Sequence, residues 1–106
     1  MAQTLLQGTL DLMVLRTLSL GPLHGVGIAD RIAQVTRGAF HVKAGSLFPA
    51  LHRLEAEGRV TAAWGESPAG RRVKLYTLTK TGRRHLAEER KSWARVALAM
   101  EQVLGM

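Results

Sequence analysis

The stretch of residues 43–58 constrains the fold more than any other part of the sequence. Its apolar residues recur at i, i+4 and i+7, the spacing that places side chains on one face of a helix. This apolar stripe consists of Leu47, Ala50, Leu51 and Leu54. Gly58 follows it as a C-terminal stop signal. The pattern therefore predicts an amphipathic helix that buries one face in a core.

The opposite face of this predicted helix is small, polar or basic. The residues expected on it are Lys43, Ser46, Pro49, His52 and Arg53. The acidic residues Glu55 and Glu57 stand only at the C-terminal end. First turns without acidic residues suit contact with a polyanion, because the positive end of the helix dipole also favours phosphate. We interpret the stretch as the recognition helix of a helix-turn-helix, with an ordinary amphipathic core helix as the alternative.

Charge and composition indicate which partners the chain can bind. Its 106 residues correspond to one domain. Fifteen Lys and Arg residues against eight Asp and Glu give a formal net charge of +7, which points to nucleic acid or an anionic membrane surface. The absence of cysteine excludes disulfides and thiolate metal sites. The sequence contains no membrane-spanning apolar run and no signal-peptide pattern, so a cytoplasmic protein is expected.

Two helices are predicted before the recognition helix. Thr9 is expected to cap the first, with Asp11 in its first turn, and apolar residues surround this helix nearly completely. It should therefore be buried on more than one side. The second helix is expected over residues 26–36. Its predicted core face consists of Ile28, Ala29, Ile32 and Val35. A short link at residues 40–42 then leads to the recognition helix, which is the helix-turn-helix layout.

After Gly58 the apolar period changes to that of β-strands. Alternating residues predict two strands around residues 60–64 and 73–78, joined by a turn-rich loop at residues 65–70. The basic residues Arg71, Arg72 and Lys74 follow this loop directly. A hairpin with a basic tip behind a recognition helix is typical of a wing, whose arginines reach phosphates or the minor groove. A solvated turn is the alternative.

A final helix, capped by Thr79, is predicted over about residues 80–104. At about 1.5 Å per residue it would be about 37 Å long, too long for the rest of the chain to cover. Its apolar residues fall on one side at near-heptad spacing: Leu86, Trp93, Val96, Ala97, Met100, Val103 and Leu104. We expect a homodimer, because a second copy is the simplest partner for an exposed apolar stripe.

These elements together predict a mainly α fold with a small β-hairpin. Residues 1–79 are expected to form a winged helix-turn-helix DNA-binding domain, and residues 80–106 a long C-terminal dimerisation helix.

Four ordered motifs make the sequence similar to the PadR family of bacterial transcriptional regulators. They lie at residues 5–12, 20–25, 45–55 and 71–79, with Gly82 behind the last. The resemblance implies a winged helix-turn-helix that dimerises through its C-terminal helix, represses by binding an operator, and is often released by a small, frequently aromatic ligand. By this likeness the recognition helix carries Lys43, Ser46, Phe48, Pro49 and His52, and the wing carries Arg71, Arg72 and Lys74.

Two positions depart from the usual pattern of that family. Val26 stands where an aromatic residue usually follows the His-Gly pair, and Phe48 stands where Tyr is common. Phe48 lacks the hydroxyl that could bond a phosphate. The chain resembles a short member with one C-terminal helix in place of a larger C-terminal domain.

Trp93 lies at the middle of the predicted dimer stripe. In a two-fold dimer its two copies could approach each other, with Leu5, Leu6 and Met13 of the first helix nearby. We hypothesise that Trp93 and Met13 border a flat apolar space in which a small aromatic effector stacks. The alternative is that Trp93 only anchors the dimer core.

Other classes of function have weaker support in the sequence. It contains no glycine-rich phosphate loop, nucleophile elbow or paired-carboxylate pocket, so we expect neither an enzyme nor a cofactor. Its four histidines are scattered, and the best candidate for a metal cluster is His85 with Glu88 and Glu89; solvated or packing histidines are the simpler interpretation. The main alternative function is a winged-helix module whose basic face binds another protein or a membrane.

Overall fold

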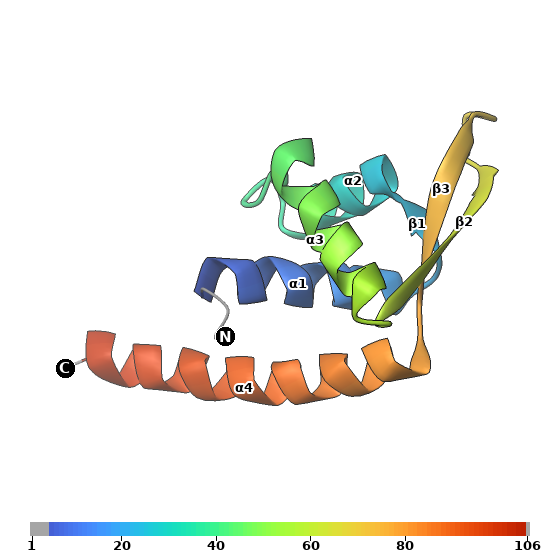
Figure 1. Ribbon diagram of the computed structural model, residues 1–106. Coiled ribbons are helices and arrows are strands. Elements are labelled where there is room, and N and C mark those ends of the chain that lie inside the picture. The colour runs from blue at the N-terminus through green and yellow to red at the C-terminus, as the bar shows by residue number, and fades with distance from the viewer. Residues whose placement is uncertain (1–4, 106) are drawn as a thin grey trace.

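The computed structural model describes residues 5–105 and, from residue 8, their side chains. The elements are α1 (Leu5–Leu18), β1 (Leu23–His24), α2 (Gly25–Val35), α3 (Ala44–Ala56), β2 (Val60–Glu66), β3 (Arg72–Leu78) and α4 (Lys80–Leu104). Helix α1 lies in the middle of the molecule, with α2 and α3 on one side of it and α4 on the other (Figure 1). The β2–β3 hairpin stands at one end of this arrangement. The predicted mainly α fold with a small β-hairpin is confirmed.

Helix α1 is the central element of the core. Its residues Val14, Leu15 and Leu18 are buried, as expected for a helix covered on more than one side. The predicted start at Thr9 is wrong, because α1 begins at Leu5. Leucine and glutamine before Thr9 are good helix formers, so the helix continues through the residue that was expected to cap it. The side chains of Leu5 and Leu6 lie outside the described residues.

The buried stripe of α3 packs against α1 and α2. All four predicted members are at most 2% exposed: Leu47, Ala50, Leu51 and Leu54. Helix α2 contributes Ile28 and Ile32 to the same core, and Ala29 is partly buried. Val35 was expected there too, but it is 70% exposed. It borders a groove of about 390 Å³ between α1 and the end of α2, so the two helices do not close over it.

The sheet has three strands in the order β1-β3-β2, where the sequence predicted a two-stranded hairpin. Strand β1 pairs with β3, with Leu23 opposite Tyr76. Val60, Tyr76 and Leu78 face the core, so Val73 and Leu75 lie on the other face of the sheet. Burial, with the negative charge of Glu55 second, raises the pKa of the Tyr76 hydroxyl above its ordinary value.

Helix α4 starts and ends as predicted. The hydroxyl of Thr79 accepts a hydrogen bond from the Gly82 amide at 3.0 Å and donates to the carbonyl of Gly58 at 2.7 Å. Gly82 approaches the carbonyl of Arg59 so closely that a Cβ would clash with it. Leu86 is 7% exposed and belongs to the core. Leu86 was predicted to lie at the dimer interface, but its own domain covers it.

Candidate nucleic-acid interface

Helix α3 presents its polar face outward. The side chains of Lys43, Ser46, Pro49 and His52 are all exposed, as the helical period predicted. The N-terminus of α3 and the tip of the β2–β3 hairpin both lie on the side of the domain away from α4 (Figure 1). The positive end of the α3 dipole and the hairpin tip therefore share one side of the molecule.

Arg53 does not belong to this open face. Its Nη2 donates to Oδ1 of Asp11 at 2.6 Å, and the Asp11 side chain is only 3% exposed. An ion pair of this kind ties α3 to the central helix and neutralises a carboxylate that burial would otherwise destabilise. The prediction that Asp11 lies in the first turn is wrong, because α1 begins at Leu5. The guanidinium of Arg53 is paired with Asp11, and a contact of Arg53 with DNA stays a prediction.

Phe48 also has a packing role that the sequence did not indicate. Its ring lies against Gly25 at the start of α2, where an added Cβ would come within 2.7 Å of the ring. The side chain remains 38% exposed. Gly25 therefore lets α2 and α3 approach each other. The Phe48 ring packs on Gly25 and so fixes the first turns of α3 against α2.

The tip of the wing is a tight and ordered turn. The Gly70 amide donates to the Ser67 carbonyl at 2.9 Å, and the Ser67 amide donates to the Arg71 carbonyl at 2.8 Å. Gly70 has φ +79°, a conformation that glycine adopts without strain. The Ser67 hydroxyl accepts from the Arg71 amide at 3.2 Å. These bonds fix the point at which the basic residues begin.

The three wing cations have different surroundings. The Arg72 guanidinium lies 4.6 Å from the centroid of the Trp64 ring. Lys74 Nζ is 4.0 Å from Glu55 Oε1, which joins the wing to the end of α3. Arg71 is exposed beside the turn. Sequence reasoning placed Trp64 only in the strand alternation. The hairpin register sets Trp64 opposite Lys74. This register could have shown that Trp64 lies beside the wing cations.

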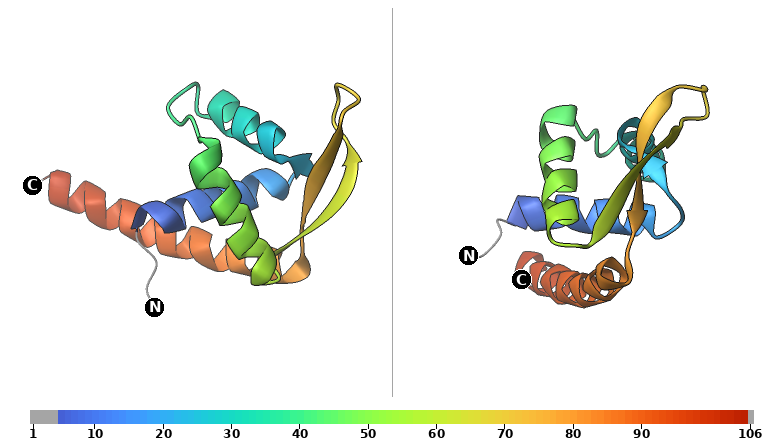
Figure 2. Two further views of the ribbon diagram at one scale, coloured as in Figure 1. Left: turned by 45° about the horizontal axis from the view of Figure 1, so that its top comes forward. Right: turned by 45° about the vertical axis from the view of Figure 1, so that its right-hand side comes forward.

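On the other side of the domain, α4 carries exposed apolar residues. These are Trp93, Val96, Leu98, Met100, Val103 and Leu104, each at least 36% exposed, while Ala97 is partly buried. The helix runs past the rest of the domain at its C-terminal end (Figure 2). Leu98 is exposed as well, but it lies on the same side of α4 as Gln102, away from the predicted stripe. A row of exposed apolar side chains on one helix is typical of an interface rather than of a solvated face.

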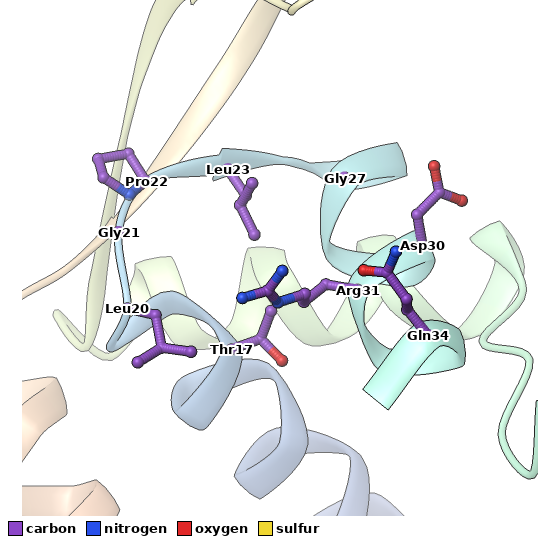
Figure 3. Close-up of a pocket in the computed structure, with 9 residues that line it drawn as sticks. All are labelled: Thr17, Leu20, Gly21, Pro22, Leu23, Gly27, Asp30, Arg31 and Gln34. Carbon is purple, nitrogen blue, oxygen red and sulfur yellow. The ribbon is translucent and has the colours of Figure 1, made fainter. Parts of the chain in front are cut away.

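Two cavities open along α1 and α2. One of about 320 Å³ lies between the end of α1 and α2, where the Arg31 side chain points toward Leu20 and Thr17 (Figure 3). The groove that borders Val35 shares these three residues and is also lined by Met13. Met13 therefore borders a groove between α1 and α2, and Trp93 is not among the residues that line it.

The described residues contain no group of three or more side chains able to hold a metal ion. His85 Nε2 lies 3.6 Å from Glu89 Oε1, one turn along α4. Among the helices of residues 5–105, none is long and apolar enough to cross a membrane.

A helix-turn-helix followed by a hairpin defines a winged-helix protein, and comparison with known proteins identifies the family. The profile of the transcriptional regulator PadR-like family matches residues 14–88. The chain belongs to this family, and it is a PadR-family transcriptional regulator.

Individual relatives support the same assignment. A transcriptional regulator of Mycobacterium tuberculosis is 32% identical over 83 residues, which cover 78% of this chain and 71% of that one. A PadR family transcription regulator from Clostridium difficile superposes with a TM-score of 0.77 at 27% identity, over 90% of this chain and 97% of that one. A transcriptional regulator from Clostridium thermocellum shares the fold, with a TM-score of 0.83 at 22% identity over 96% of each chain.

Proposed function

We propose that the protein is a sequence-specific repressor that binds a palindromic operator in the cytoplasm as a homodimer. One observation carries this proposal: the N-terminus of α3 and the tip of the wing lie on one side of the domain, and α4, with its exposed apolar residues, lies on the other (Figure 1). A two-fold dimer through α4 leaves both recognition surfaces free. It can then set them about 34–36 Å apart, the spacing of successive major grooves on one face of DNA.

The dimer surface in this proposal consists of Trp93, Val96, Ala97, Met100, Val103 and Leu104, without Leu86, which its own domain covers. A small aromatic effector is proposed to act at this interface, against Trp93 and Met13. Trp93 is 43% exposed and Met13 is partly buried, so both keep surface that a ligand or a second copy can cover.

Selection of bound fragments from a random duplex library tests the function directly. A repeated palindrome with half-sites one helical turn apart is expected. Binding should weaken steeply with salt, because phosphate contacts release counterions. Liposomes of anionic lipid serve as the control. If the protein binds liposomes but selects no duplex sequence, the result would instead support the alternative, a winged-helix module whose basic face binds a protein or a membrane.

The wing should supply affinity without sequence preference. Replacing Arg71 and Arg72 by alanine is expected to weaken binding to operator and random duplexes alike, because both side chains would contact phosphate. Each lost contact should remove about 0.9 from the slope of log K against log salt. Titrations at several salt concentrations measure this slope. An unchanged slope in the double variant would contradict the wing assignment.

The outward face of α3 should supply sequence preference. His52→Ala or Ser46→Ala is expected to cost about 1–3 kcal/mol at particular base pairs, where a hydrogen bond to a base edge is lost. Binding to operators with single base-pair changes measures the preference of each variant. Equal losses for operator and random DNA would mean that these residues only position the helix.

A further inference from the structure

The wing carries an exposed tryptophan in addition to its cations. Trp64 is 65% exposed, and its ring lies under the Arg72 guanidinium at 4.6 Å. In the hairpin register Trp64 is opposite Lys74, and Glu66 is opposite Arg72. Residues directly opposite each other share a face of the sheet, so the indole and the guanidinium stack along one face of the wing.

This face of the hairpin is continuous with the one that packs on the core. Val60, opposite Leu78, and Ala62, opposite Tyr76, belong to it nearer the base of the hairpin. Farther from the base, this face of the hairpin is turned toward the C-terminal end of α3, because Lys74 lies near Glu55. Trp64 and Arg72 therefore lie beyond the core on the wing face that looks toward the recognition helix.

We propose that Trp64 is a positioning residue for DNA binding, and that it acts by holding Arg72 ready for a backbone phosphate. A guanidinium held over the face of an indole by a cation–π contact still has N–H groups that can donate to a phosphate. The ring restricts the arginine side chain before DNA arrives, so less rotamer entropy is lost when the phosphate contact forms. This inference rests on the proposed function, because it assumes that the wing meets duplex DNA.

Arg71 provides a matched comparison on the same wing. It is the preceding residue, carries the same charge and is exposed, and the described residues give it no contact with an aromatic ring. If ring contact matters, removal of the indole should affect binding through Arg72 and leave the contribution of Arg71 unchanged.

A double-mutant cycle on the full chain tests this difference. Trp64→Ala is expected to weaken binding to any duplex about three- to thirty-fold, with the salt slope nearly unchanged because no charge is removed. In the Arg72→Ala background, the same substitution should have almost no further effect. In the Arg71→Ala background it should keep its full effect. Trp64→Phe, which retains a ring, should recover most of the affinity.

Two further measurements make the outcomes distinct. Thermal melts should show little change for Trp64→Ala, because most of the side chain is already in solvent. In a Trp93→Phe protein, Trp64 fluorescence should change as duplex DNA is added. Equal losses in the Arg72→Ala and wild-type backgrounds, or no loss at all, would overturn the inference. If the wild-type protein binds no duplex with salt dependence, the proposed function fails instead.

Discussion

Removal of residues 90–106 is expected to give a monomer that loses most of its operator affinity. The shortened chain keeps Gly82 and Leu86, through which α4 packs on the core, so the domain should still fold. It loses the exposed apolar part of α4. A monomer reads a single half-site, and loss of the second, linked contact should lower affinity about 10²–10⁴-fold. Sedimentation equilibrium and operator titration measure the two effects.

A point variant with a matched control separates the interface from chain length. Met100→Glu places a charge in the apolar stripe and should also dissociate the dimer, because burying an unpaired carboxylate is unfavourable. Gln102→Glu adds the same charge on the opposite side of the helix and should leave the dimer intact. A shortened chain that sediments as a dimer would refute α4 as the interface.

Features that depend on local periodicity were predictable from the sequence. The stripe of α3, the ends of α4 and the Thr79 cap follow from residues a few positions apart. Strand β1 was missed because its two residues carry no period, and their strand character comes from pairing with Tyr76 and Leu75. Leu86 continues the apolar line of α4, yet it is buried in its own domain. Periodicity identifies an apolar face but does not say which molecule covers it.

The candidate site shows the same limit more strongly. Helical spacing placed Arg53 on the polar face of α3, but its partner Asp11 lies 42 residues earlier in the chain. The Trp64–Arg72 stack depends on the hairpin register, which the turn around Gly70 determines. A one-residue slip would turn either side chain to the other face of the sheet. Contacts between residues far apart in the sequence therefore determine which polar side chains of α3 and the wing remain exposed.

Arg53→Met should destabilise the fold more than any exposed substitution on α3. It leaves the Asp11 carboxylate, 3% exposed, without its counter-charge. Loss of one partner of such a pair should cost about 3 kcal/mol of the free energy of unfolding. In a domain of this size this lowers Tm by about 15 °C. Calorimetry at one fixed protein concentration measures the change, since a dimer's Tm depends on concentration.

The double variant Asp11→Leu with Arg53→Met separates stability from DNA contact. It removes both charges and replaces them with apolar side chains, so most of the lost stability should return. If Arg53 only ties α3 to α1, this stable double variant should bind operator and random DNA nearly as well as the wild type. A double variant that melts like the wild type but has lost affinity and about 0.9 of the salt slope would show that Arg53 contacts a phosphate after all.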